Sequence, residues 1–428
     1  MKMPHDTFKL YFKYIFRKVQ RLHTAMHKIW NIFSAAPHRM FFFGGAVQSL
    51  IALAWWLADL GGRFAGFYAP LSWAISPIDA HAFLMIYGLF PFFIFGFLMT
   101  TYPRWMNGEA VTRRHYVPAF LLLSAGTILF YAGLIVDQRL LTTALLVFLA
   151  GWGMGLYALL RVYMRAKHPD KRHAAITSVV LGLGWLLLAG FATGEAHLLT
   201  LARTGGIWLF LLPVFFAVSH RMIPFFSASA LPGYKLVRPD WALLLIPAGA
   251  VLHAILDITG QQDWTWLVDL PMAAGAIYLT WVWRLRASLA IPLLGMVHIG
   301  FAWLGIALLL FSAQSLVLLA TGTLILAKAP LHAMAAGYFA SMLLAMATRV
   351  TLGHSGGQLV ADRLTWGMFL AFQSVAVLRI VSELPGLGIA VRSHIYLCAG
   401  LVWLVCFGLW ACKYLPIYWK PRSDGQPD

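Results

Sequence analysis

Among residues whose side chains can ionise or bind a metal, histidine is the most frequent in the apolar segments of this chain. Seven of the fifteen histidines fall inside or at the ends of long apolar segments, where ionisable side chains are costly and usually functional. They are His81, His197, His220, His253, His298, His332 and His354. Neutral imidazole is a common protein ligand of haem iron and of copper. The pattern predicts at least one site for metal or haem, and the competing interpretation of each single histidine is a hydrogen-bonded packing residue.

The segments that carry these histidines belong to a membrane protein by composition. Of 428 residues, 61% are apolar and 11% are charged, and the mean hydropathy is +0.76. In a soluble protein, roughly a quarter of the residues are charged, so this composition excludes a cytosolic enzyme and a disordered chain. The three cysteines all lie in the last apolar segment without a C-x-x-C pair, which excludes a disulfide scaffold and a zinc site. The composition predicts an all-α, polytopic transmembrane helical bundle.

A transmembrane helix needs about 20 apolar residues, and the chain has room for about twelve. The predicted spans are 40–60, 80–102, 117–136, 141–163, 173–193, 204–226, 241–258, 264–283, 291–311, 330–350, 364–381 and 394–415. The apolar stretch 312–328 is short and contains Ser312 and Gln314, so we interpret it as re-entrant or interfacial, with a thirteenth span as the alternative. Residues 40–415 are therefore expected to form a single transmembrane domain.

Basic residues indicate the orientation of this domain. The N-terminal tail has eight of them, whereas all loops on the opposite side together have six. Because basic residues accumulate in cytoplasmic loops, both termini are predicted to be cytoplasmic. Residues 1–39 form a basic segment with apolar residues at helical spacing from Phe8 to Val19, typical of a helix on anionic lipid and not of a nucleic-acid arm. Residues 416–428 form a cytoplasmic tail.

This orientation sorts the seven histidines by depth. His81, His197, His253 and His332 fall toward the periplasmic side and could converge in one layer. His220, His298 and His354 fall in the cytoplasmic half. At a rise of about 1.5 Å per residue, His298 and His332 differ in depth by roughly 10 Å or more, which excludes them as the two axial ligands of one haem.

Other side chains at helical spacing could support these sites. Asp257 follows His253 by four residues and could orient its ring, and Met85 could place a thioether beside His81. Arg221 and Arg349 could bind carboxylates such as haem propionates, although arginines at span ends often serve only as topological anchors. The chain has no C-x-x-C-H motif, so any haem is non-covalent.

The remaining polar motifs are interpreted as structural. His5, His23, His27, His38, His115, His168 and His173 lie in polar segments and are expected to be solvated. The glycine-rich stretch 352–357 (LGHSGG) follows a helix, so it is expected to form a tight cytoplasmic turn that brings the backbone close to a ligand or a neighbouring helix.

Three stretches carry a shared motif pattern. They are HAMAAG at 332–337 with Met342 and TRVTLGHSG at 348–356, RMIPFF at 221–226, and DAHAFLMIYG at 79–88 with GFL at 96–98. Together they resemble the NnrS family of bacterial haem- and copper-containing membrane proteins, and His298 with Trp303 gives a fourth match. The chain has Asp79 and Ala82 where the family pattern has His and Glu, and His220 where it commonly has Gly.

The resemblance implies a protein of the bacterial inner membrane that binds haem b and, as a further cofactor, copper, and that meets nitric oxide or a similar diatomic ligand. The candidate cofactor-binding residues are His81, His253, His298, His332, His354, Arg221 and Arg349, with His220 as a further metal ligand. Whether such a protein catalyses, senses or carries is left open by the residue types.

Two other functions compete with this one. A secondary transporter could use the histidines and arginines as a proton or anion pathway, although no internal repeat is apparent. A haem–copper oxidase or nitric oxide reductase subunit also has about twelve spans, but its binuclear site resembles one that needs two adjacent histidines, and this sequence has no such neighbours.

Overall fold

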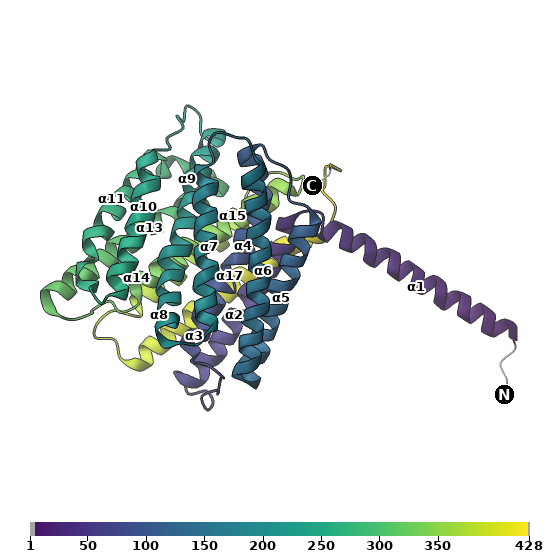
Figure 1. The fold of residues 1–428 in the computed structure, drawn as a ribbon, viewed down its shortest axis with the longest axis horizontal. Helices are drawn as coiled ribbons and strands as arrows, with labels where there is room; N and C mark the ends of the chain where they lie inside the picture. Colours follow the sequence, from purple (N-terminus) through teal and green to yellow (C-terminus); the bar gives the residue numbers. More distant parts are fainter. Residues whose placement is uncertain (1–4, 427–428) are drawn as a thin grey trace.

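The computed structural model describes residues 5–426, without the side chains of residues 5–13 and 22, and all regular elements in this part of the chain are helices. A chain that crosses lipid must satisfy its backbone polar groups internally, which helices do. Eleven helical stretches are long and apolar enough to cross a membrane, and a shorter apolar helix spans Trp266–Val282. Each predicted span coincides with one of these stretches, which confirms the polytopic helical bundle (Figure 1).

The first half of the bundle is built from α2 to α9. The elements are α1 (His5–Phe33), α2 (Pro37–Arg63), α3 (Pro77–Ala82), η1 (Phe83–Tyr87), α4 (Phe90–Met106), α5 (Arg113–Val136), α6 (Gln138–Arg165), α7 (Arg172–Ala192), α8 (Ala196–Gly205), η2 (Gly206–Leu211) and α9 (Leu212–Ala230). The tightest neighbours here are the antiparallel pair α5 and α6, while α4 packs against α2 and α6.

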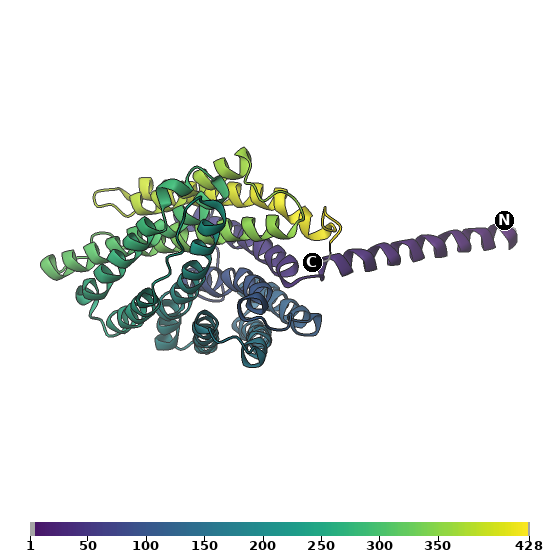
Figure 2. The ribbon, with the colours of Figure 1, turned by 90° about the horizontal axis from the view of Figure 1, so that it is seen from above.

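The second half continues the same architecture. Its elements are α10 (Asp240–Ile258), η3 (Gln262–Trp264), α11 (Trp266–Val282), α12 (Leu285–Ser288), α13 (Pro292–Thr321), α14 (Ala329–His332), η4 (Ala333–Ala340), α15 (Ser341–His354), α16 (Arg363–Val381), α17 (Ile389–Tyr414) and η5 (Leu415–Trp419). Helix α17 packs back on α2, so that the last span closes the bundle against the first (Figure 2).

The interpretation of residues 312–328 as re-entrant or interfacial is wrong. Helix α13 runs without a break to Thr321 and ends at Gly322, which has a left-handed φ of 68°. Of the two polar residues that suggested an end, Ser312 Oγ donates to the carbonyl of Leu308 (2.9 Å), whereas Gln314 Oε1 is buried without a hydrogen-bond partner among the described residues. Serine inside a helix can bond to the preceding turn in this way.

The bundle has two ends that are distinguishable by the chain itself. At the end where α2 begins, which we call the inner end, the Arg39 guanidinium donates to the carbonyls of Tyr418 (3.2 Å) and Lys420 (2.8 Å). The start of the first span and the end of the last therefore meet at one end (Figure 1). That this end faces the cytoplasm stays a prediction.

The opposite end, which we call the outer end, contains three π-helical segments. Each follows a short helix that Figure 1 labels at this end of the bundle: η1 follows α3, η2 follows α8 and η4 follows α14. Segments η1 and η2 also pack against each other. π-helical turns are rare in proteins overall, but those that occur are often at functional sites. The outer end is therefore a candidate location for a functional site.

Helix α1 projects away from the bundle and contacts it through its last turn (Figures 1 and 2). Phe33 stacks on Trp419 with ring centroids 4.3 Å apart. Phe16, Val19 and Met26 are each about 60% exposed beside basic side chains. The predictions for the side chains of His5, Phe8, Tyr11 and Phe12 lie outside the described residues. An apolar stripe beside basic residues is typical of a helix at a membrane surface.

A peptide of residues 5–33 is expected to bind vesicles that contain anionic lipid. Changing Arg17 and Lys18 to glutamine should weaken this binding by about 2 kcal/mol, since each basic residue near such a surface contributes about 1 kcal/mol. Partitioning measured by tryptophan fluorescence of Trp30 checks the result. The difference between the two peptides should disappear on neutral vesicles, and equal binding to both lipid types would contradict the proposed surface role.

Candidate functional site

Two predicted histidines, His81 and His332, lie together at the outer end. The His81 ring stacks on Trp56 with centroids 4.0 Å apart. His332 Nδ1 lies 2.9 Å from the carbonyl of Lys328, and its Nε2 lies 3.2 Å from Arg379 Nη2. The two imidazoles interact electrostatically with each other. His332 immediately precedes η4, and His81 lies two residues before η1, so both rings stand at the start of a π-helical segment.

A cation occupies the space beside this pair. Arg379 donates to Glu383 Oε1 (3.3 Å), and its guanidinium lies 4.1 Å from the Tyr396 ring centroid. Tyr396 also donates to Glu383 (3.1 Å). With Nδ1 turned to a carbonyl, the remaining lone pair of His332 faces Arg379. A metal ion bound by His332 Nε2 would therefore have to displace this guanidinium.

The local backbone changes which side chains lie beside His81. Met85 lies inside η1, where the α-helical spacing that predicted its contact with His81 does not hold. Asp79, which stands where the resembled pattern has a histidine, forms an ion pair with Arg203 at 2.5 Å. Among the described residues, no group of three or more His, Cys, Asp or Glu side chains is placed to hold a metal ion. The outer end thus offers two imidazoles.

His253 belongs to a different arrangement. Its Nδ1 lies 2.7 Å from Asp269 Oδ1, and both side chains are buried, so the prediction that Asp257 orients this ring is wrong. Asp257 instead accepts from Thr204 (3.1 Å) and Gln262. Trp208 of η2 stacks on the His253 ring at 3.5 Å. The partner was missed because it lies on the next helix, α11, and not on the same helix face.

The four outer histidines therefore do not converge. His81 and His332 are neighbours, His253 is paired with Asp269, and His197 is exposed on α8. The predicted layer of four is replaced by one pair and one buried histidine–aspartate pair. The roles of His81, His253 and His332 as ligands stay predictions.

His220 and His173 form a buried pair toward the inner end. His173 Nε2 and His220 Nδ1 are 3.0 Å apart, and His220 Nε2 is 3.1 Å from the carbonyl of Pro239. A carbonyl oxygen can only accept a hydrogen bond, so His220 Nε2 carries a proton and donates to it. In the neutral ring, His220 Nδ1 is then unprotonated and accepts a hydrogen bond from His173 Nε2. The expectation that His173 is solvated is wrong, because it is 2% exposed at the start of α7. Its position in a basic loop concealed its burial.

His354 pairs with a histidine that the sequence suggested was solvated. The rings of His354 and His38 have centroids 4.5 Å apart, and His38 is only 2% exposed. The expectation for His38 is therefore wrong: it begins the first span and does not lie in solvent. Its Nδ1 has no hydrogen-bond partner within the described residues. Arg39, Arg104 and Arg422 act on it electrostatically, so this end of the bundle is strongly basic.

A tight turn follows His354 as its glycines predicted, but its backbone meets the C-terminal tail and not a neighbouring helix. Gly356 has a φ of 74°, and a Cβ at this position would lie 2.6 Å from Asp424. The amide of Ser423 donates to the carbonyl of Ser355 (2.9 Å), so the turn brings its backbone against the C-terminal tail. In that tail, hydrogen bonds from Arg422 lower the pKa of Asp424 to about 2.

The other inner histidine, His298, is satisfied by a neighbouring hydroxyl. It is 2% exposed on α13, and its Nε2 lies 2.9 Å from Ser227 Oγ on α9. His220, His298 and His354 thus each have a different partner and do not form a common site. A packing role explains the burial of His298, and its role as a ligand stays a prediction.

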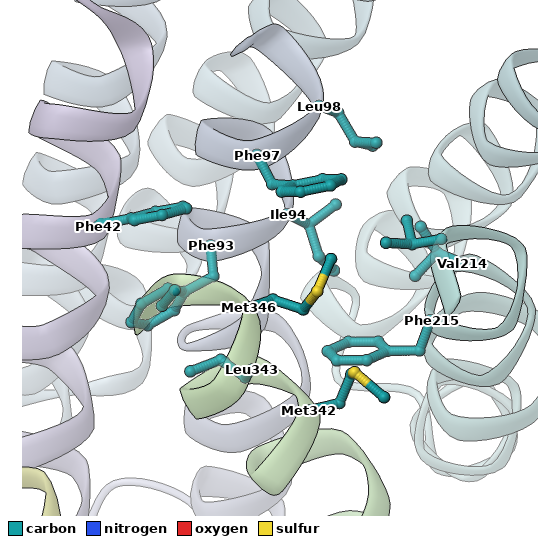
Figure 3. Close-up of a pocket in the computed structure, with 12 residues that line it drawn as sticks. Phe42, Phe93, Ile94, Phe97, Leu98, Val214, Phe215, Met342, Leu343 and Met346 are labelled. Carbon is teal, nitrogen blue, oxygen red and sulfur yellow. The ribbon is translucent and has the colours of Figure 1, made fainter. Parts of the chain in front are cut away.

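A cavity between α2, α4, α9 and α15 is lined by apolar side chains alone (Figure 3). Its volume is about 50 Å³. Its lining comprises Phe42, Phe93, Ile94, Phe97, Leu98, Val214, Phe215, Val218, Met342, Leu343, Met346 and Ala347. We call it the four-helix cavity. Sequence analysis missed it, because four segments far apart in the chain form it.

Two arginines lie one helical turn from this cavity. Arg349 follows Met342 and Met346 by seven and three residues on α15, and Arg221 follows Val214 by seven on α9. Residues at these spacings share a helix face. The Arg349 guanidinium lies 3.8 Å from the Phe226 ring centroid, and that of Arg221 lies 4.9 Å from Trp105.

Both guanidinium groups are half-buried. Arg221 Nη2 donates to the carbonyl of Trp105 (3.3 Å), but neither arginine forms an ion pair with a carboxylate among the side chains that the structure describes. A partly buried arginine ordinarily has an anionic partner. The four-helix cavity and these two arginines together form an apolar compartment with a cationic end, which suits an apolar ligand that carries anionic groups at one edge.

Comparison with known proteins adds an independent assignment. No curated protein matches the chain. A protein-family model described as NnrS protein matches residues 32–422 of the 428 residues, which covers all helices except most of α1. The chain therefore belongs to the NnrS family.

Proposed function

We propose that this protein is a multi-pass protein of the bacterial inner membrane that binds haem b non-covalently and acts in the response to nitric oxide or nitrosative stress. The observation that carries the proposal is the half-buried pair Arg221 and Arg349, without carboxylate partners among the described residues, at one end of the apolar four-helix cavity. Membership in the NnrS family supports it.

The chemistry of the cavity fits haem. Haem is an apolar macrocycle with two carboxylates at one edge, and arginine binds carboxylates through a planar fork of donors. Arg221 and Arg349 would bind the carboxylates. Because the cavity is only about 50 Å³, the four helices would have to separate before its aromatic and aliphatic lining could pack against the macrocycle. When bound, haem iron supplies a coordination position that a diatomic molecule such as nitric oxide can occupy. The apolar lining would keep water from this position, which favours an uncharged diatomic ligand over an anion.

Copper is the second cofactor of the proposal, with His81 and His332 as its imidazole ligands. Imidazole suits copper, and these two rings are the histidine pair nearest the π-helical segments of the outer end. Binding there requires Arg379 to leave His332 Nε2. Haem is therefore the better supported of the two cofactors.

The purified full chain in detergent is expected to show a Soret band and to contain about one haem b per chain. The haem should be extracted by acidified organic solvent, since no C-x-x-C-H motif is present for covalent attachment. The reduced protein should change its Soret spectrum when nitric oxide is added. Metal analysis of the same sample measures iron and copper. His197→Ala provides a matched control, because His197 is exposed on α8.

The transporter hypothesis predicts a purified protein that contains no haem. A preparation without a Soret band and without stoichiometric metal would contradict haem binding. Proton or anion flux in proteoliposomes made from that preparation would then favour a carrier that uses the same arginines.

A further inference from the structure

The four-helix cavity offers almost no hydrogen-bonding atom to a molecule inside it. Its lining consists of Phe, Ile, Leu, Val, Ala and Met side chains, and only the thioether sulfurs of Met342 and Met346 are not hydrocarbon. Figure 3 shows Ile94, Phe215 and Met346 directed into the space between α4, α9 and α15. A thioether is a weak acceptor, and a buried water molecule needs about two to four polar partners. The lining therefore favours an apolar occupant over water.

The polar side chains that adjoin the lining along its helices contact other partners. Ser219 on α9 has its hydroxyl 3.2 Å from that of Tyr338. Ser341 on α15 donates to Gln373 Oε1 at 3.2 Å. The imidazoles of α2, α9 and α15 contact other imidazoles, and none of them is part of the lining. The wall of the cavity is therefore apolar on every side.

The size of the cavity selects a very small molecule. As the four helices are arranged, its volume is about 50 Å³, and a single water molecule already needs roughly 10–15 Å³. Haem enters only if the helices separate, whereas a molecule of about two heavy atoms fits the cavity as it is. All lining residues are buried except Val218, which is half-buried. Val218 therefore marks the side from which a small molecule can enter.

We propose that the four-helix cavity, in this closed arrangement, binds an uncharged diatomic gas molecule that enters from the lipid. Such a molecule needs no hydrogen bonds, and its transfer from water into an apolar environment is favourable. An ion or a polar molecule of the same size would lose its hydrogen bonds to water without replacement. The choice of nitric oxide as the gas rests on the proposed function, but the existence of the gas site does not.

The test uses crystals of the haem-free full chain under xenon pressure, since dry apolar cavities bind xenon. Anomalous scattering should locate a xenon atom in the four-helix cavity. Ala347→Val adds two methyl groups to the lining and should remove this atom, and Val214→Ile should lower its occupancy. Leu98→Ala enlarges the cavity and should raise the occupancy. Ala371→Val adds the same two methyl groups at an exposed position of α16 and should leave the xenon unchanged. Nitric oxide should compete with xenon for the same space.

Several outcomes would overturn the assignment. They are ordered water in the cavity, a wild-type cavity that contains no xenon, and equal xenon occupancy in the wild type and in both filling variants. Xenon occupancy that nitric oxide does not lower would exclude a diatomic gas as the occupant. Because xenon binding needs no haem, a purified chain without a Soret band would overturn the proposed function and leave the gas site in place.

Discussion

Replacing Arg221 and Arg349 together with glutamine is expected to prevent stable haem binding while the bundle still folds. A hydrogen bond to a charged group contributes about 1.5–3 kcal/mol, so losing both carboxylate contacts should cost about 3–6 kcal/mol. This corresponds to a weakening of Kd by about 10²- to 10⁴-fold. Titration of the haem-free chain with haem, followed by Soret absorbance, measures the change directly.

Matched substitutions separate this effect from a general loss of positive charge. Arg286→Gln removes an exposed arginine and should leave haem affinity unchanged. The double lysine variant keeps both charges but loses the planar fork of donors, so its affinity should fall between those of wild type and the glutamine variant. The stacking on Trp105 and Phe226 is expected to contribute about 1 kcal/mol of bundle stability per arginine. Unchanged haem affinity in the folded glutamine variant would remove the main support for the cavity as the haem site.

The sequence predicted the bundle well because lipid leaves a chain few alternatives. An apolar run long enough to cross the bilayer must be a helix, and each predicted span lies on one. The error at residues 312–328 has the same origin. Ser312 was interpreted as a break, although its hydroxyl is satisfied by the carbonyl of Leu308 on the same helix. Hydropathy reports the polarity of a side chain but not the presence of a local acceptor.

Partners on other helices were not predictable from spacing. Asp257 stands four residues from His253, but Asp269 on the following helix is the residue that bonds it. His38 and His173 begin their spans among basic residues, and only the packing of α15 and α9 against them buries both rings. Periodicity locates residues on one helix face. It does not indicate which faces meet.

The candidate site shows both sides of this limit. Arg221 and Arg349 were predicted from their residue type as anchors for carboxylates, and that interpretation remains part of the proposal. The cavity beside them was not predicted, although a signal for it exists in the sequence. Met342, Met346 and Arg349 repeat at the spacing of one helix face, as do Val214, Val218 and Arg221. Two such series, each ending in arginine, predict an apolar compartment with a cationic end once the two helices are known to be neighbours.

Removing His253 is expected to destabilise the bundle without affecting haem. In His253→Leu, the fully buried Asp269 loses the imidazole that bonds its Oδ1, while its Oδ2 already has no partner in the described part of the chain. Breaking a buried pair by removing one member costs about 3–5 kcal/mol, because the other group is left uncompensated. Thermal unfolding in detergent, compared with wild type, measures this loss, and Soret absorbance per chain measures haem content in the same samples.

The double variant His253→Leu with Asp269→Leu provides the control, because no polar group is then left unpaired. Replacement of both partners by apolar groups can be nearly neutral, so the double variant should recover most of the stability that either single variant loses. Trp208 and Phe311 surround the His253 ring and would pack against leucine in its place. Such a recovery would identify the pair as a structural unit of α10 and α11. Loss of haem in His253→Leu without loss of stability would instead support the role of His253 as a ligand.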